Sequence, residues 1–382
     1  QAQSHTPKKN TLNYLMILAI TVTVLGCLAL PSFAATCAVD GSSYEYSETV
    51  SGSIRTVTFN VCPNHYFDMG QLNPNYAVSG AETYKMPSSP MLESSITKDV
   101  SGQGGSVGVL FNGAYLFSPF AGKVALTGYS SSATALEGDT FEKCGCHSSS
   151  SSSAGYHCHI PPSCLLAQLG ETTTDHSPQV GWAPDGFPVY GPRGPSGALI
   201  KLCSESTNSD TTYCLDECSG LEMELPEVDD FKYRYYITGE DWLDGSNSKP
   251  LDGSDPINPL STEPYYPFTP KCYRGCCPSG ATCSGTRADP PSCSGSATAG
   301  TTSSYAAAAK WPSGLPVYDG TSVSSGSPSP SPSPSPTPPT PTPTPGPGGT
   351  SSSSQVPASL MIGTVGVVLF LGVSYTRLND EP

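Results

Sequence analysis

The cysteines constrain this chain more than any other residue type does. The sequence holds 15 cysteines, and all but Cys27 lie between Cys37 and Cys293. Cys27 stands in an apolar run near the N-terminus, whereas the other fourteen are spread over more polar sequence. Whether those fourteen form disulfides or thiolate metal sites depends on the compartment that the chain enters.

The N-terminal apolar run, Leu12 to Leu30, has the features of a secretory signal peptide. Lys8 and Lys9 precede it, and the small-residue pattern Ser32-Phe33-Ala34 follows. We predict a signal peptide over residues 1–34, with an uncleaved signal anchor as the alternative because the run is long. Since a secreted chain meets an oxidising environment, we expect most of the fourteen cysteines to form disulfides.

A second apolar run, Val356 to Tyr375, carries no charge and is long enough to cross a bilayer. Arg377 follows it in a short polar tail, residues 376–382. We predict a transmembrane helix over residues 356–375 in a type I single-pass protein of the plasma membrane, with an extracellular ectodomain and a short cytoplasmic tail. The alternatives are a glycolipid (GPI) anchor that replaces this run and a secreted protein.

Two segments before the predicted membrane span are unsuited to a hydrophobic core. Residues 276–300 are dense in cysteine and poor in apolar side chains, which predicts a small appendage held by disulfides. Residues 301–355 are rich in Ser, Thr and Pro. Their alternating prolines favour an extended polyproline II stalk, and the serines and threonines suit O-glycosylation.

Residues 35–275 are the only region able to build a sizeable core. Apolar runs there are short, as in Thr56 to Phe59 and Val107 to Phe111, and Gly, Pro, Ser and Asn interrupt them at close intervals. This pattern predicts a mainly β domain with long loops and one or two short helices, one around Leu165 to Leu169 and one near Leu221.

The charge balance argues against polyanionic partners. The chain has 32 acidic and 17 basic residues, and its net charge is −15. Nucleic acid and anionic lipid are therefore disfavoured as partners. We also find no serine nucleophile elbow, glycine-rich phosphate loop or closely paired carboxylate motif.

Chemistry-bearing residues concentrate in one segment, Cys144 to Pro162. It holds three of the chain's six histidines, His147, His157 and His159. Side chains alternate faces in an extended segment, so His157 and His159 point the same way with their Cβ atoms about 6.5–7 Å apart. The serine run Ser148–Ser153 readily forms a loop, which allows His147 to fold back as a third ligand.

Three neutral imidazoles suit Zn²⁺ or Cu²⁺, whereas Ca²⁺ and Mg²⁺ prefer oxygen ligands. We therefore predict that these three histidines hold copper or zinc. The alternative is that they are hydrogen-bonded structural residues. Three protein ligands would leave an open coordination position where a water molecule could be activated.

Three other residues of the head are second-tier candidates. His65 and His176 could complete the metal site, although a lone histidine is more often structural. Asp185 lies in a proline-braced loop, Pro184 to Pro192. Its carboxylate could accept the second ring N–H of a ligand histidine, or it could be an ordinary turn residue that caps Gly186.

The head resembles the YHYH family of secreted and surface proteins. The motif that names the family stands here as Tyr156-His157-Cys158-His159, after a lead-in of Asp139, Cys144 and His147. The other matching pieces are Asn60 to His65, Val107 to Tyr115, Gly181 to Pro192, Tyr233 to Tyr236 and Cys272 to Gly275. The likeness covers residues 54–275, and it implies no particular activity.

Two cysteines depart from the family pattern. Cys158 stands where the second tyrosine would be, and Cys146 stands where a glycine usually precedes the histidine. Within the resemblance, both changes add a thiol to one short segment, and the simplest interpretation is that the two form a disulfide. In a reducing compartment they could join a mixed thiolate and imidazole zinc site, but secretion would oxidise exposed thiols, so we leave them out of the ligand set.

Three classes of function remain open at this point. The favoured one is a stalk-mounted surface domain that binds copper or zinc. A second is a metal-dependent extracellular enzyme that acts on a polymer or a small ligand. The third is a structural or adhesive head in which the histidines bind no metal.

Overall fold

The computed structural model describes residues 35–66, 73–100, 104–124, 128–142, 144–239, 265–286 and 288–302. The chain divides into two compact units, Gln1–Ser327 and Pro328–Pro382, and every described residue belongs to the first. The predicted signal peptide, nearly all of the predicted stalk and the predicted transmembrane helix lie outside the described residues. Within the described ranges, no helix is both long and apolar enough to span a membrane.

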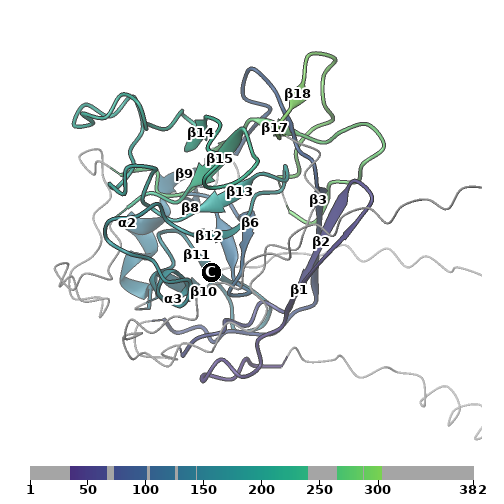
Figure 1. Cartoon of the computed structure of the whole chain (residues 1–382). Coiled ribbons are helices and arrows are strands. Elements are labelled where there is room, and N and C mark those ends of the chain that lie inside the picture. Colours follow the sequence, from purple (N-terminus) through teal and green to yellow (C-terminus); the bar gives the residue numbers. More distant parts are fainter. Residues whose placement is uncertain are drawn as a thin grey trace, which may run out of the picture. The chain divides into compact units, whose positions relative to one another are not determined.

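A mixed sheet of eight strands forms the centre of the head (Figure 1). In spatial order its strands are β10 (Cys146–Ser148), β11 (Tyr156–Cys158), β7 (Tyr115–Phe117), β6 (Ser106–Leu110), β12 (Gln179–Trp182), β13 (Pro188–Tyr190), β15 (Tyr233–Tyr236) and β14 (Gly220–Glu222). The β11–β7 and β13–β15 pairs are parallel, and the other neighbours are antiparallel. The head is therefore mainly β, as the sequence predicts.

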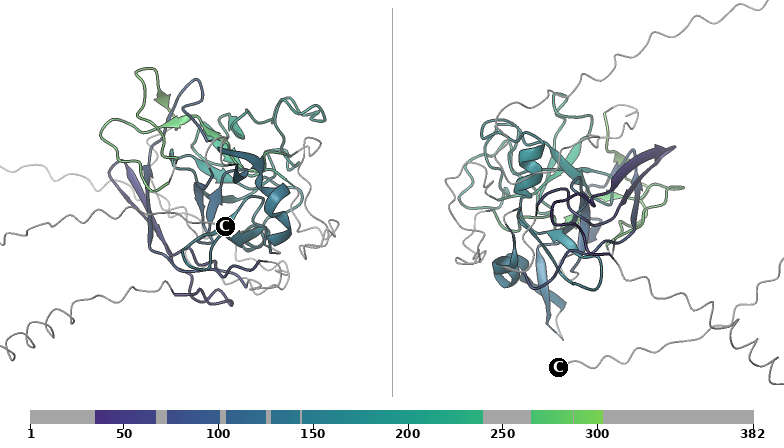
Figure 2. Two further views of the ribbon diagram at one scale, coloured as in Figure 1. Left: turned by 180° about the vertical axis from the view of Figure 1, so that it is seen from behind. Right: turned by 90° about the horizontal axis from the view of Figure 1, so that it is seen from below.

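Smaller sheets and three short helices surround this main sheet. The sheets are β1 (Tyr46–Ser51), β2 (Ile54–Phe59) and β3 (Glu82–Pro87); β8 (Phe120–Val124) and β9 (Gly128–Ser132); β5 (Lys98–Asp99) and β16 (Cys272–Tyr273); and β4 (Met91–Leu92) with β17 (Gly275–Cys276) and β18 (Thr298–Ala299). The helices are α2 (Ala133–Glu137), the 3-10 turn η1 (Gly138–Thr140) and α3 (Ser163–Gln168). Figures 1 and 2 show the β1–β2–β3 sheet on one side of the main sheet and α2 and α3 on the other.

Local sequence explains the first hairpin. In β2 the buried residues Arg55, Val57 and Phe59 alternate with more exposed ones, which is the period of a strand with one covered face. A two-residue turn joins Ser51 to Ile54, and Gly52 in that turn has a φ of 58°. Glycine adopts this left-handed conformation at little cost, so the turn favours the hairpin.

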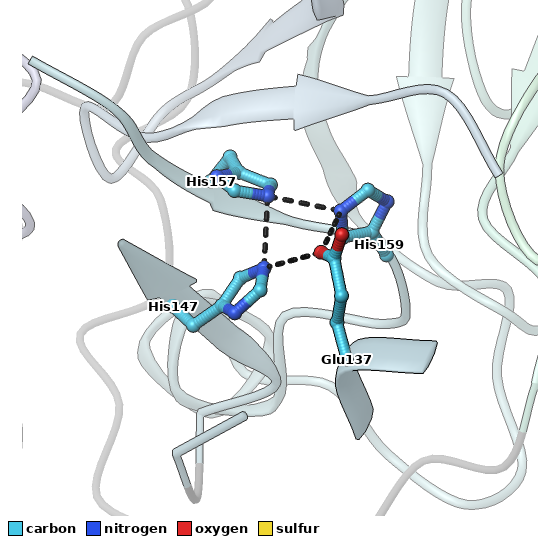
Figure 3. Close-up of side chains that lie close together, drawn as sticks. All are labelled: Glu137, His147, His157 and His159. Carbon is cyan, nitrogen blue, oxygen red and sulfur yellow. Dashed lines mark hydrogen bonds and ion pairs between the residues drawn. The ribbon is translucent and has the colours of Figure 1, made fainter. Parts of the chain in front are cut away.

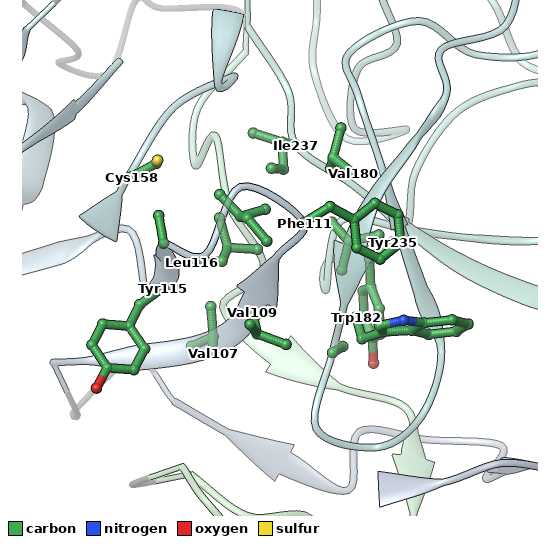
Figure 4. Close-up of a cluster of buried hydrophobic side chains, with 14 of the residues drawn as sticks. Val107, Val109, Phe111, Tyr115, Leu116, Cys158, Val180, Trp182, Tyr235 and Ile237 are labelled. Carbon is green, nitrogen blue, oxygen red and sulfur yellow. The ribbon is translucent and has the colours of Figure 1, made fainter. Parts of the chain in front are cut away.

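The hydrophobic core lies around β6 and its neighbours (Figure 4). All five residues of β6 are buried, because other strands pair with both of its edges and side chains cover both of its faces. At Gly181 of β12, a Cβ atom would stand only 2.1 Å from the carbonyl oxygen of Val109. The backbones of β12 and β6 therefore approach closely only because this position is glycine.

All fourteen cysteines from Cys37 to Cys293 are paired, which confirms the expectation of a disulfide-stabilised head. The seven bonds are Cys37–Cys62, Cys144–Cys164, Cys146–Cys158, Cys203–Cys214, Cys218–Cys272, Cys276–Cys293 and Cys277–Cys283. The cysteine-dense segment after residue 275 holds two of these bonds and also supplies β17 and β18, which pair with β4. It is thus joined to the head by backbone hydrogen bonds as well as by chain continuity.

One helix expectation is confirmed and another is wrong. The helix expected around Leu165 exists as α3. The helix expected near Leu221 does not, because this residue lies in β14, paired across from Arg234 of β15. Asp216 accepts backbone N–H groups from Cys218 and Gly220, so the chain turns sharply before Leu221 and enters the sheet instead of coiling. We did not predict α2, which has only five residues.

Candidate metal centre

The β10–β11 hairpin places two of the predicted ligands opposite each other. The strands pair antiparallel, with His147 across from His157 and Cys146 across from Cys158. The two cysteines form a disulfide, so a covalent bond fixes the register one residue away from the histidine pair. The serine run makes the connection between the strands, and His147 thereby returns to the neighbourhood of the other two histidines.

Three imidazoles and one carboxylate converge at this edge of the main sheet (Figure 3). The Nε2 atom of His157 lies 2.9 Å from that of His147 and 2.9 Å from that of His159. Glu137, the last residue of α2, brings Oε2 to 3.3 Å from His147 Nε2 and 3.7 Å from His159 Nε2. We call these four residues the His/Glu cluster. One possible ligand atom from each lies within 4.8 Å of the others.

Packing holds the three rings of the cluster rigidly. They are between 1 and 5 % exposed, whereas the Glu137 side chain is 34 % exposed. Phe117 stacks on His157 with ring centroids 3.8 Å apart, and Phe141 stacks on His159. Buried rings with aromatic neighbours lose their rotational freedom when the chain folds, so little further ordering is needed to bind an ion.

Two of the rings donate their outer N–H group to backbone carbonyls. His157 Nδ1 lies 2.7 Å from the carbonyl oxygen of Gly155, and His159 Nδ1 lies 2.8 Å from that of Ser118. A carbonyl oxygen can only accept, so the proton of each neutral ring is on Nδ1. Their Nε2 atoms carry lone pairs, which is the arrangement that metal-binding histidines adopt.

The third ring has the same tautomer. His147 Nδ1 lies 2.6 Å from the hydroxyl oxygen of Thr140, and that hydroxyl donates its own proton to the carbonyl of Glu137 at 2.7 Å. The hydroxyl must therefore accept from His147, which places the ring proton on Nδ1. A neutral His147 thus also turns a bare Nε2 atom toward the centre of the cluster.

The cluster consequently brings four acceptor atoms together with no donor among them. Two nitrogen lone pairs 2.9 Å apart repel each other unless a positive charge lies between them. One proton on His147 could bridge to a single neighbour, but it would leave the pair formed by His157 and His159 unsatisfied. A metal ion shared by all four atoms satisfies every lone pair at once.

Burial makes protons a poor alternative to a metal ion. Desolvation, and then repulsion from the other two rings, holds the pKa of His157 well below its usual value of 6.5. Burial and the charge of His147 likewise lower the pKa of His159 to about 4. Burial alone would raise the pKa of Glu137, but electrostatic interactions with the adjacent His147 and His159 rings lower it overall. Near pH 7 His157 and His159 are therefore neutral and Glu137 is ionised, the protonation states that bind metal.

These shifts predict an acid-resistant site. Protons compete with a metal ion for histidine nitrogens, so rings whose pKa lies below the usual 6.5 keep their ion to lower pH. Because the pKa of His159 is lowered to about 4, we expect bound Zn²⁺ to remain at pH 5.5 and to be lost as the pH approaches 4. Equilibrium dialysis against Zn²⁺ at a series of pH values measures this, and half-release at pH 6 or above would contradict it.

The same shifts make the stability of the metal-free chain depend on pH. Because the pKa values of His157 and His159 are lower in the folded chain than in the unfolded one, their contribution to stability is fully present above about pH 6.5 and is lost as the pH falls toward 4.

The second-tier histidines lie outside the cluster. His65 is buried in a network with Glu142 and Tyr156, where its Nε2 atom lies 2.8 Å from the Tyr156 hydroxyl and 3.3 Å from Glu142. Cys144 lies beside them, but its sulfur is bonded to Cys164 and cannot act as a thiolate ligand. Only His65 and Glu142 of this group could therefore act as metal ligands.

His176 bonds to the Tyr236 hydroxyl at 2.8 Å, and burial, followed by the charge of Arg234, lowers its pKa to about 4. Asp185 is fully buried and accepts hydrogen bonds from the Tyr235 hydroxyl and two backbone N–H groups. None of the hydrogen bonds found for this carboxylate comes from a histidine. Burial raises its pKa to about 6, against the lowering effect of these donors. Asp185 thus links β15 of the main sheet to β17, and it lies outside the His/Glu cluster.

The sequence reading missed Glu137. This residue stands ten positions before His147, and the acidic residue of that stretch named in the family pattern was Asp139. Only the turn from α2 through η1 brings the carboxylate back over the rings, with Thr140 linking the turn to His147. A five-residue helix leaves almost no periodic signal, so the only available hint was an acidic residue shortly before the first histidine.

Fold and site together define a disulfide-rich, mainly β domain that carries a buried cluster of three histidines and one carboxylate. Residues 83–213 match the family model described as YHYH protein. The resemblance to the YHYH family is therefore confirmed over this range, which includes the whole His/Glu cluster. The match does not extend to the pieces at Asn60 to His65, Tyr233 to Tyr236 and Cys272 to Gly275. No curated protein and no solved structure gives a significant match.

Proposed function

We propose that this protein is a metal-binding surface protein whose His/Glu cluster holds one Zn²⁺ or Cu²⁺ ion. The observation that carries the proposal is the hydrogen bonding of the three rings, which directs three lone pairs and a carboxylate oxygen at one point. Two nitrogens 2.9 Å apart can each lie about 2.0–2.1 Å from a shared ion when the bond angle is near 90°. Imidazole and carboxylate ligands suit zinc and copper, and the absence of thiolate from the cluster disfavours Cu⁺.

Calorimetric titration of the chelator-stripped chain with Zn²⁺ and Cu²⁺ near pH 7.5 tests the proposal. We expect one ion per chain with a dissociation constant of about 1 μM or tighter, since four preorganised donors contribute to binding. Binding weaker than millimolar for both ions would refute it. The structural or adhesive head would then be the better interpretation.

Glu137→Gln isolates the contribution of the carboxylate. Glutamine keeps the size of the side chain but removes its charge, and an amide oxygen is a weaker ligand for zinc. We expect the affinity for Zn²⁺ to fall about tenfold to hundredfold while the thermal stability of the metal-free chain changes little. The same titration measures the affinity, and Glu205→Gln, in a loop whose hydrogen bonds are local, is a matched control. Equal affinities for parent and Glu137→Gln would remove the carboxylate from the ligand set.

We also propose that the head is displayed on the outer face of the plasma membrane, carried by the Ser/Thr/Pro-rich stalk and the apolar run at residues 356–375. Seven disulfides fit an oxidising compartment and support this placement. Labelling of intact cells with a membrane-impermeant reagent is expected to modify the chain. Release of the labelled chain by a phospholipase would indicate a glycolipid anchor instead, and recovery of all of it from the medium would indicate secretion.

A further inference from the structure

A cleft of about 450 Å³ lies beside the His/Glu cluster. Glu137, His157 and His159 line it, so three of the four cluster residues face the same space. Clefts of this size commonly hold small molecules. His147 does not line the cleft, which indicates that the cluster is approached from one side.

The walls of the cleft combine aromatic rings with acidic and hydroxyl groups. Tyr115 and Phe117 come from β7 and Phe120 from β8. The ring of Phe117 stacks on the ring of His157. Glu82 adds a second carboxylate, and exposed Ser153 lies where the serine run borders the cleft. Among the described residues that line it there is no lysine or arginine.

The donor geometry leaves room on the metal for one more ligand. The 2.9 Å separations between ring nitrogens correspond to bond angles of about 90° at a shared ion, smaller than the roughly 109° of a closed tetrahedral site. Four protein donors do not fill the coordination sphere of a five- or six-coordinate ion such as Cu²⁺. The cleft is the space that Glu137, His157 and His159 share, so a further ligand would reach the ion from that side.

We propose that the cleft binds a small uncharged molecule that coordinates the metal of the His/Glu cluster through an oxygen or nitrogen atom. This inference rests on the proposed metal-binding function and specifies what the site accepts. The aromatic walls favour a ligand with apolar surface, and the ion supplies the polar contact that fixes its orientation. Glu82 disfavours anions, and the described residues that line the cleft include no lysine or arginine to offset it. The positive ion disfavours cations, so a neutral ligand fits best.

Imidazole, a small neutral donor, is a direct probe of the vacant position. The full chain is loaded with one equivalent of Cu²⁺, and imidazole is titrated while the electron paramagnetic resonance spectrum is recorded. We expect a saturable change in the copper signal without release of copper from the chain. No change in the spectrum would show that the protein closes the coordination sphere, and this would overturn the proposal.

Two neighbouring serines offer a matched pair of blocking variants. Both Ser152 and Ser153 are exposed in the serine run, but only Ser153 lines the cleft. Ser153→Trp should weaken imidazole binding at least about tenfold by filling the entrance, whereas Ser152→Trp should leave it within about twofold of the parent. Both variants should bind Cu²⁺ as the parent does. Equal effects of the two substitutions would show that the metal is reached by another route.

Glu82→Gln tests the charge argument with a second probe. Removing a carboxylate that lines the cleft should strengthen the binding of azide, an anion, roughly threefold to tenfold and should leave imidazole binding unchanged. A variant that binds both probes as the parent does would contradict the selection against anions. Failure of Cu²⁺ itself to bind in calorimetry would instead refute the proposed function, so the two failures are distinguishable.

Discussion

Replacing His157 by alanine is expected to lower the affinity for Zn²⁺ by about a hundredfold or more. This ring occupies the middle of the His/Glu cluster, with its Nε2 atom 2.9 Å from those of both His147 and His159. Its loss removes one ligand and also the ring that lies between the other two. Calorimetric titration of the stripped chain near pH 7.5 measures the change.

His176→Ala is the control for this experiment. His176 is also partly buried and hydrogen-bonded to a side-chain partner, but it lies outside the cluster. We expect its replacement to affect thermal stability without changing Zn²⁺ affinity. Comparable affinity losses in the two variants would point to a general effect of misfolding, and an unchanged affinity in His157→Ala would refute the cluster as the binding site.

The second large effect concerns the disulfide beside the ligand pair. Replacing both Cys146 and Cys158 by alanine should lower the free energy of unfolding by about 3 kcal/mol, since the unfolded chain regains the entropy of an open loop. It should also weaken Zn²⁺ binding about tenfold, because the bond fixes the register that sets His147 opposite His157. Denaturant unfolding and calorimetric titration measure the two effects separately.

A second disulfide provides a matched control. Cys203 and Cys214 are 11 residues apart, against 12 for Cys146 and Cys158, so their loops close at nearly the same entropic cost. Their replacement by alanine should destabilise the chain by a similar amount and leave the affinity for Zn²⁺ unchanged. Equal losses of metal affinity in both double variants would show that the Cys146–Cys158 bond has no particular role in positioning the ligands.

The sequence predicted the three histidines of the cluster because their grouping follows from local geometry. The period of an extended strand places His157 and His159 on one face, and a serine-rich connection suits the return of His147. Glu137 could not be inferred in this way. Its approach depends on how α2 and η1 fold back over the hairpin, and this involves contacts that no local pattern encodes.

The fold could be predicted only as a class. Short apolar runs indicated strands, and fourteen cysteines indicated disulfides, but strand order depends on long-range pairing. β11, for example, lies parallel to β7, about forty residues earlier in the chain. Near Leu221, helix-forming residues enter a strand because tertiary pairing with β15 outweighs a weak local preference. For Asp185 the sequence left two roles open, orienting a ligand histidine or capping a turn, and its burial gives it backbone and tyrosine partners.

X-ray absorption spectroscopy at the zinc edge tests the central claim most directly. It reports the type of ligand and the distance to it in the zinc-loaded chain. The His/Glu cluster predicts nitrogen and oxygen ligands at about 2.0–2.2 Å with the outer-shell scattering of about three imidazoles. In His157→Ala the imidazole contribution should decrease in any zinc that remains bound. A sulfur shell at about 2.3 Å, or a spectrum without imidazole scattering, would contradict the proposed site.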